Sequence, residues 1–166
     1  MVDKFDQCFE WLRGNEGGYS NNPNDAGGET MWGVTVAVAR ECGYHGNMNE
    51  MTVETAKEIY KARYWRDWMD CAPMPLAFEL FDTAVNSGPG VAARLLQRTL
   101  GVAEDGTVGP RTRAAATARS PSALWVAFVG VRLEYLTRCK GWPHFSAGWT
   151  NRVAGNLKRG AAALEG

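Results

Sequence analysis

The stretch Asn15-Glu-Gly-Gly-Tyr-Ser-Asn-Asn-Pro-Asn-Asp-Ala-Gly-Gly-Glu-Thr-Met-Trp-Gly33 separates two segments that are patterned for helices. It contains five glycines, four asparagines and one proline, and these residues disfavour a helix and favour tight turns. We therefore predict a loop or a small, irregular hairpin at residues 15–33. Long loops in compact domains are often functional, so this stretch is also the first place to look for chemistry.

Helical patterns occupy most of the remaining sequence. Before the loop, Phe5, Cys8, Phe9 and Leu12 follow the i, i+3, i+4, i+7 spacing of one apolar helix face. Capping residues, first-turn prolines and terminal glycines mark the ends of the later helices. The predicted helices cover about residues 3–13, 35–41, 52–68, 75–88, 91–100, 110–118, 121–139 and 146–164. The predicted fold class is therefore mostly α (α+β), with a minor sheet at the loop.

The 166 residues carry no net charge, but their charges are distributed unevenly. Residues 1–83 hold 7 basic and 14 acidic side chains, whereas residues 84–166 hold 11 basic and 4 acidic ones. A balanced total argues against a protein that binds nucleic acid. The asymmetry is compatible with an acidic site that faces a basic surface, and also with two solvated faces of opposite sign.

Few residues are suited to metal binding or to crossing a membrane. The four cysteines form no C-x-x-C pair, and the only histidines are His45 and His144, so we predict no metal site and no cofactor. We expect the cysteines to be small buried residues. No apolar run approaches the ~18 residues of a membrane-spanning helix, and the N-terminal residues lack the apolar core of a secretory signal. We expect a soluble product made in the cytoplasm, without membrane insertion.

Two carboxylates in the loop, Glu16 and Asp25, are candidates for acid–base chemistry. Glu16 follows the first helix, where burial against apolar neighbours would raise its pKa toward that of a general acid. Asp25 lies in an asparagine-rich setting and is expected to stay ionised. Such a pair suits cleavage of a glycosidic bond. Alternatively, Glu16 caps a neighbouring helix and Asp25 forms a turn with Pro23 and Gly27, and spacing alone favours this structural alternative.

A series of short motifs runs along nearly the whole chain. They are Glu16-Gly-Gly-Tyr-Ser-Asn21, Pro23-Asn-Asp25, Gly27-Gly28-Glu-Thr30, Gly33-Val-Thr35, Tyr60-Lys-Ala-Arg-Tyr64-Trp65, Phe81-Asp82-Thr-Ala-Val-Asn86-Ser-Gly88, Leu96-Gln97-Arg-Thr-Leu100-Gly101 and Asp105-Gly106-Thr-Val-Gly109-Pro110, then Thr112. In this order they resemble glycoside hydrolase family 108, the N-acetylmuramidases often found as bacteriophage endolysins. The resemblance implies a lysozyme-like fold.

The resemblance also implies roles for three residues of the loop. The glutamate of Glu-Gly-Gly-Tyr is the family's catalytic acid, which corresponds to Glu16. Lysozyme-like phage enzymes place an aspartate some nine residues later, as Asp25 is here, and then a threonine. Thr30 lies one residue earlier than the usual threonine, so Thr30 and Thr35 are rival candidates for the third role, and we assign Thr30.

The predicted substrate-binding residues are Tyr19, Asn21, Thr35, Asp82 and Asn86. Tyr19 is the aromatic residue that we expect to stack on a sugar ring. Asp82 and Asn86 are four residues apart and share a helix face, where Asn86 can hydrogen-bond an N-acetyl or hydroxyl group. A hydrogen bond between helices is an equally good interpretation of this pair.

The implied function is that of an endolysin, a peptidoglycan hydrolase. It would cleave the β-1,4 bond between N-acetylmuramic acid and N-acetylglucosamine by general acid catalysis. It would be a monomer that waits in the host cytoplasm until a holin opens the inner membrane. A lytic transglycosylase and a non-catalytic cell-wall-binding protein are the alternatives. We expect one domain over residues 1–166, with a catalytic lobe at about 1–88 and a helical lobe at about 89–166 that resembles a peptidoglycan-binding segment.

The last predicted helix allows two interpretations. Its cations Arg152, Lys158 and Arg159, in the basic half of the chain, suggest binding to the anionic envelope. Alternatively, the helix packs on the core through Trp149, Val153, Leu157 and Leu164, and its cations form a solvated face, which is the interpretation that the apolar stripe favours.

Overall fold

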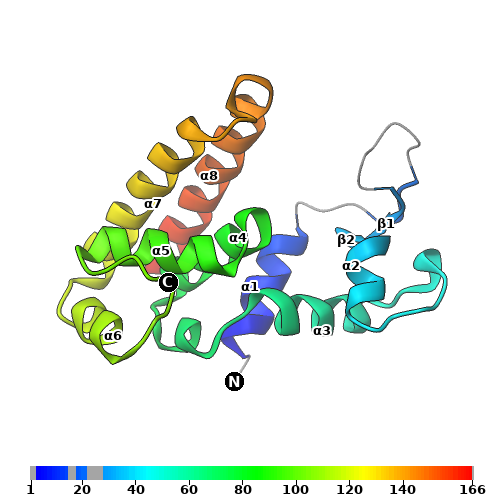
Figure 1. Cartoon of the computed structure of the whole chain (residues 1–166), viewed down its shortest axis with the longest axis horizontal. Helices are drawn as coiled ribbons and strands as arrows, with labels where there is room; N and C mark the ends of the chain where they lie inside the picture. The colour runs from blue at the N-terminus through cyan, green and yellow to red at the C-terminus, as the bar shows by residue number, and fades with distance from the viewer. Residues whose placement is uncertain (1–2, 15–17, 22–27, 166) are drawn as a thin grey trace. The chain divides into compact units, whose positions relative to one another are not determined.

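The computed structural model describes residues 3–14, 18–21 and 28–165, and its contacts divide the chain into two compact units, residues 1–65 and 66–166 (Figure 1). The predicted mostly α fold with a small sheet is confirmed. The helices and strands are α1 (Lys4–Arg13), β1 (Thr30–Met31), β2 (Val34–Thr35), α2 (Val36–Glu41), η1 (Met48–Glu50), α3 (Val53–Tyr64), η2 (Asp67–Cys71), α4 (Met74–Ser87), α5 (Pro89–Leu100), α6 (Pro110–Thr117), α7 (Pro121–Arg138) and α8 (Trp142–Glu165). The two η segments are short 3₁₀ helices.

Aromatic side chains hold α1 against α3 in the first unit. Phe5 meets Trp65 edge-on, with 5.4 Å between ring centroids, and Phe9 meets Tyr60 at 5.5 Å. These are the predicted apolar positions of α1, and all four side chains are buried. Edge-to-face pairs of this kind add to the free energy gained from apolar burial.

The predicted hairpin lies at Thr30–Thr35, and its turn places a tryptophan in an unusual backbone conformation. β1 and β2 are antiparallel, and the two turn residues Trp32 and Gly33 have φ angles of 53° and 76°. Positive φ at both turn positions matches the twist of the strands, but it is unfavourable for a bulky residue. The Trp32 indole donates a hydrogen bond to the Met51 carbonyl over 2.9 Å, so a tertiary contact anchors the turn.

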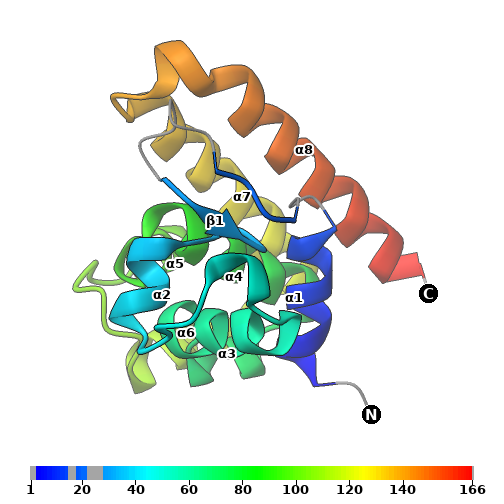
Figure 2. The same ribbon diagram turned by 90° about the vertical axis from the view of Figure 1, so that its right-hand side faces the viewer.

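The second unit is built around α4. This helix contacts α5, α7 and α8, and all of its residues from Pro75 to Ala84 are buried. α7 and α8 lie side by side in both Figure 1 and Figure 2. The contacts therefore divide the chain after Trp65, so that α4 belongs with α5 to α8, whereas the predicted lobes meet at about residue 88. The prediction of one domain stays a prediction.

Three expectations from the sequence are wrong in detail. α3 ends at Tyr64 instead of Trp68, because Trp65 adopts an extended backbone (φ −77°, ψ 145°) with its ring against Phe5. α8 begins at Trp142, four residues before the predicted start, with a proline in its first turn, where no donor is lost. Among the cysteines only Cys8 is buried, whereas Cys42 and Cys71 are exposed and Cys139 is partly exposed.

Two glycines of α8 give opposite predictions for the same substitution. A Cβ atom at Gly160 would collide with the Trp125 ring, with Cη2 at 2.9 Å and Pro75 Cβ at 3.2 Å, whereas Gly155 has no atom within 4 Å. We expect Gly160→Ala to lower the free energy of unfolding by about 1–3 kcal/mol through overpacking. Gly155→Ala should raise it by about 0.5–1 kcal/mol, because alanine restricts the unfolded chain. Urea denaturation of both variants measures the contrast, and equal effects would show that α8 does not pack here.

Candidate active site

The two predicted catalytic carboxylates, Glu16 and Asp25, lie outside the described residues. The residues that flank them are described: α1 ends at Arg13 with Gly14 as its C-cap, and Ser20 forms an antiparallel bridge with Thr30. The bridge has both backbone hydrogen bonds, with N···O distances of 2.9 and 2.8 Å. The bridge thus places Ser20, four residues after Glu16 in the sequence, beside the first residue of β1.

The bridge brings Tyr19 and Asn21 next to the start of β1. The Tyr19 hydroxyl donates a hydrogen bond to Glu29 Oε1 over 2.9 Å. Because the Glu29 carboxylate accepts this hydrogen bond and so stabilises the protonated hydroxyl, the pKa of Tyr19 is raised above its ordinary value. The Tyr19 side chain is 46% exposed. Its hydroxyl is therefore anchored while its ring is open to solvent, as stacking on a sugar requires, and Asn21 beside it is also exposed.

Glu29 is the residue of this corner that the sequence-based assignment missed. It lies within the quoted loop and next to Thr30, so the signal was present, but nothing local distinguished it from the other acidic residues. The pairing of Ser20 with Thr30 brings Glu29 to Tyr19, and their hydrogen bond is seen only in the folded chain.

The rival threonines Thr30 and Thr35 are directly opposite each other in the hairpin register. Thr35 is the N-cap of α2, and its hydroxyl accepts a hydrogen bond from the Val38 N–H over 3.3 Å. Among the described residues, no hydrogen-bond partner of the Thr30 hydroxyl is found. The Thr35 hydroxyl therefore serves to cap α2, whereas the Thr30 hydroxyl has no such structural role among the described residues. Both threonines are only partly buried.

The structure places Asp82 in a buried ion-pair network. Asp82 is 1% exposed, and its carboxylate receives Arg132 Nη2 at 2.6 Å, Arg152 Nε at 2.9 Å and Asn156 Nδ2 at 3.0 Å. All three donors come from α7 or α8. This geometry favours the second interpretation of Asp82, a contact between helices, over contact with a sugar.

Glu79 is the second carboxylate of this network. It lies one turn before Asp82, and its Oε2 accepts from Arg132 Nη1 at 2.5 Å. Burial raises the pKa of Glu79, and the negative charge of Asp82 acts in the same direction against the opposing effect of Arg132. For Asp82, burial also favours the neutral form, but Arg132 and Arg152 outweigh it and lower the pKa. The Arg132 guanidinium thus pairs with two carboxylates, and the pKa is raised for Glu79 and lowered for Asp82.

Asn86 lies at the solvent-facing end of α4. Its Nδ2 donates to the Asp82 carbonyl at 2.6 Å, within the helix, and the residue is exposed. Asn86 and Asp82 are thus adjacent on one face, as predicted, but only Asn86 reaches the surface.

The motif at residues 96–112 forms a turn that is held by hydrogen bonds of the Gln97 side chain. Gln97 is buried and donates from Nε2 to Asp105 Oδ1 at 2.7 Å and to the Thr107 carbonyl at 3.0 Å. Its Oε1 accepts from the Gly106 N–H at 2.8 Å, and Gly106 has a φ of 80°. The Gln and the Asp-Gly of this motif therefore hold a connection between helices, which is the plain interpretation of the pattern.

The cations predicted for envelope binding are largely engaged inside the second unit. Arg152 belongs to the ion-pair network, and the Arg159 guanidinium lies 5.5 Å from the centre of the Phe78 ring. Lys158 is exposed, and Val153 is buried as predicted, but Leu164 is 53% exposed. α8 contacts α4 and α7, in agreement with the interpretation of a packed helix, and envelope binding stays a prediction.

Two kinds of feature are absent from the described part of the chain. Residues 3–14, 18–21 and 28–165 contain no group of three or more His, Cys, Asp or Glu side chains placed to hold a metal ion. Within the same ranges, every helix is too short or too polar to span a membrane.

Comparisons with known proteins show which families this chain is similar to. The family model described as Glycosyl hydrolase 108 matches residues 9–88, which include the hairpin, and the model described as Predicted Peptidoglycan domain matches residues 91–154. A solved structure of Brucella abortus SagA is similar, with 30% sequence identity and a TM-score of 0.83 over 95% of this chain and 94% of that chain. No curated protein sequence gives a match.

Together, the fold and these matches define the class of the protein, a glycoside hydrolase that acts on peptidoglycan. The predicted lysozyme-like fold class is confirmed. The chain belongs to glycoside hydrolase family 108.

Proposed function

We propose that the protein is an N-acetylmuramidase. It hydrolyses the β-1,4 bond between N-acetylmuramic acid and N-acetylglucosamine. The observation that carries this proposal is the position of the Glu-Gly-Gly-Tyr motif at residues 16–19. The motif lies inside the family match and directly before the Ser20–Thr30 bridge.

This proposal gives a defined task to five residues of the loop. Glu16 protonates the leaving oxygen, and Asp25 orients water or offsets positive charge on the sugar ring. Thr30 helps to place the water, a role supported by its hydroxyl having no partner among the described residues. Tyr19 offers its exposed ring to a sugar, with its orientation set by Glu29.

The sugar ends of the products distinguish this proposal from a lytic transglycosylase. Hydrolysis consumes water and leaves a reducing N-acetylmuramic acid, whereas a transglycosylase leaves an anhydro-sugar without adding water. We expect mass spectrometry of digested peptidoglycan to find reducing muramic acid ends, with the same products in EDTA because no metal is expected. Anhydro ends would favour the transglycosylase, and no released fragments would favour a non-catalytic wall-binding protein.

The biological setting that we propose is bacteriophage lysis. The protein would accumulate in the host cytoplasm and reach the wall as a monomer once a holin has opened the inner membrane. Expression in a bacterial host with and without a holin tests this setting, because only the pair should lyse the culture.

A further inference from the structure

One face of α8 is aromatic at its start. Trp142, Phe145 and Trp149 follow the i, i+3, i+7 spacing of a single helix face. The same face continues along the helix through its buried residues, which are Val153, Asn156 and Gly160. The start of the stripe is open by contrast, because Phe145 is 59% exposed and the two tryptophans are partly exposed. We call Trp142, Phe145 and Trp149 the aromatic platform.

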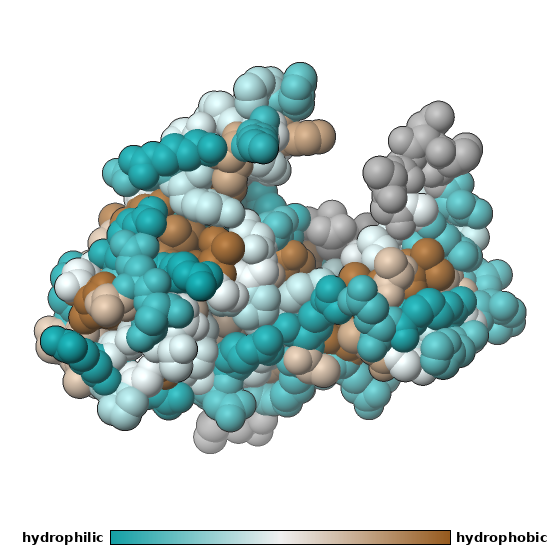
Figure 3. Space-filling view, in the orientation of Figure 1, coloured by the Kyte–Doolittle hydropathy of each residue, from teal (hydrophilic) through white to brown (hydrophobic). Residues whose placement is uncertain are grey.

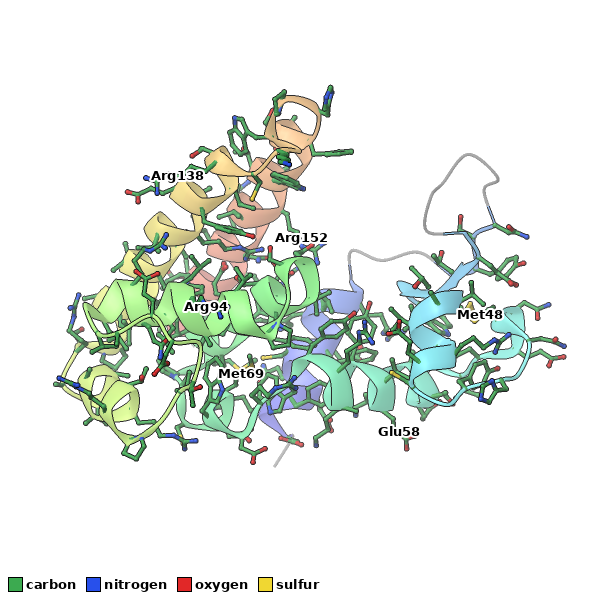
Figure 4. All side chains as sticks on the ribbon, in the orientation of Figure 1. Met48, Glu58, Met69, Arg94, Arg138 and Arg152 are labelled. Atoms are coloured by element: carbon green, nitrogen blue, oxygen red, sulfur yellow. The ribbon has the colours of Figure 1, made fainter. Side chains whose placement is uncertain are left out.

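The aromatic platform lies where α8 extends beyond the helix that covers the rest of its stripe. An ion pair between Arg152 and Asp82 joins α8 to α4, and Figure 4 labels Arg152 at this point. The platform precedes Arg152 in the chain, and in Figures 1 and 2 this end of α8 projects past α4 together with α7. The apolar stripe of a surface helix normally faces a core. Its continuation past that core therefore indicates a binding surface.

The rings of the aromatic platform hold one another in place. Trp149 stacks on Phe145, with 6.0 Å between ring centroids and 30° between the planes, and Trp142 lies 6.2 Å from Trp149. The backbone of the turn between α7 and α8 supports two of the rings. A Cβ atom at Gly141 would lie 2.9 Å from Trp149 Cη2 and 3.2 Å from Phe145 Cδ2. Because the rings are already packed, a ligand that binds here has little ordering of side chains to offset.

The chemistry of the aromatic platform suits a sugar better than a lipid bilayer. An aromatic ring offers a flat apolar face, against which the C–H groups of a β-1,4-linked sugar can pack. The platform also lies within residues 91–154, which match the model described as Predicted Peptidoglycan domain. A helix that lies in a bilayer interface needs a large apolar face. On the side that Figure 3 shows, the projecting end of α7 and α8 is mostly hydrophilic or intermediate.

We propose that the aromatic platform binds the glycan strand of peptidoglycan, with a sugar ring stacked on Phe145 and with Trp149 packed behind it. The choice of a glycan as ligand rests on the proposed function, whereas the place of contact rests on the exposed rings. This contact is separate in sequence from the one proposed for Tyr19. The platform holds the strand and takes no part in bond cleavage.

Titration of the full chain with a trisaccharide of β-1,4-linked N-acetylglucosamine tests the proposal, because this probe contains neither peptide nor lipid. We expect the indole N–H signals of Trp142 and Trp149 to shift in NMR spectra. Phe145→Leu keeps an apolar side chain but loses the flat face, so the affinity read from these signals should fall about 2–10-fold. Phe145→Tyr keeps the ring and should stay within about twofold of the wild type. Signals that do not respond to the sugar, or wild-type affinity in folded Phe145→Leu, would overturn the proposal.

Two further variants locate the interaction. Val126→Ala is the matched control, because Val126 is an apolar residue of α7 that is 58% exposed and lies outside the aromatic platform, and its affinity should equal that of the wild type. Tyr19→Leu removes the other ring proposed to stack on a sugar, and the Trp149 signal should still shift. If that shift disappears with Tyr19, the platform does not bind the glycan itself. Thermal melting verifies that each variant is folded.

Vesicles of phosphatidylcholine and phosphatidylglycerol test the rival ligand. If the signals of Trp142 and Trp149 shift with the vesicles and not with the trisaccharide, the aromatic platform is a membrane contact and the glycan assignment is wrong. With the glycan as the ligand, the vesicles should leave both signals unchanged.

This test and the product analysis fail separately. A protein that releases no sugar ends, but whose Trp149 signal shifts with the trisaccharide, keeps its platform and loses its proposed activity. A protein that releases reducing ends, but whose platform signals do not respond to the sugar, keeps its activity and loses the platform.

Discussion

Glu16→Gln is expected to reduce the rate of peptidoglycan hydrolysis by about 10²–10⁴-fold. Glutamine has the shape of glutamate but carries no proton to donate to the leaving oxygen, so binding should persist while turnover collapses. The rate of release of reducing sugar ends measures the effect, and circular dichroism verifies the fold.

Glu29→Gln is the matched control for this substitution. Glu29 is a glutamate of the same loop, but it holds the Tyr19 hydroxyl and has no proposed part in proton transfer. Glutamine retains an acceptor for that hydrogen bond, so the loss should be far smaller than for Glu16→Gln. Near wild-type turnover of folded Glu16→Gln, or equal losses in both variants, would contradict the assignment of the acid.

Arg132→Met is expected to lower the free energy of unfolding by about 3–5 kcal/mol. Arg132 is the only residue whose guanidinium contacts both Glu79 and Asp82 among the described residues. Its removal leaves two buried carboxylates with a single remaining arginine partner, Arg152, which contacts Asp82. Because a buried charge without a partner is far more unfavourable than a buried pair, the effect should approach the whole stability of a small domain. Urea denaturation measures it.

Two comparisons separate charge from packing in this prediction. Arg138→Met, at an exposed position of the same helix, should change stability by no more than about 0.5 kcal/mol. Adding Glu79→Gln to Arg132→Met should recover part of the loss, because one of the stranded charges is removed. If Arg132→Met is as stable as Arg138→Met, the network does not hold α4 to α7.

Short-range patterns of the sequence determined most of the secondary structure. The apolar stripe of α1, the proline starts of α6 and α7 and the turn at Gly88 act within about four residues, so the sequence alone predicted these elements. The hairpin was predicted for the same reason, from glycine, asparagine and proline in one stretch. The motif resemblance predicted the family, which the comparisons confirm.

Only the tertiary structure decided what Asp82 and Trp65 do. Asp82 meets Arg132 and Arg152, which lie 50 and 70 residues further along the chain, and no local pattern specifies such a pairing. The end of α3 at Trp65 depends on the packing of the Trp65 ring against Phe5. A helix pattern shows which residues share a face, but the packing of other helices decides whether that face meets solvent, a sugar or an arginine. Because a buried carboxylate without a partner is strongly unfavourable, the buried Asp82 is paired with arginine.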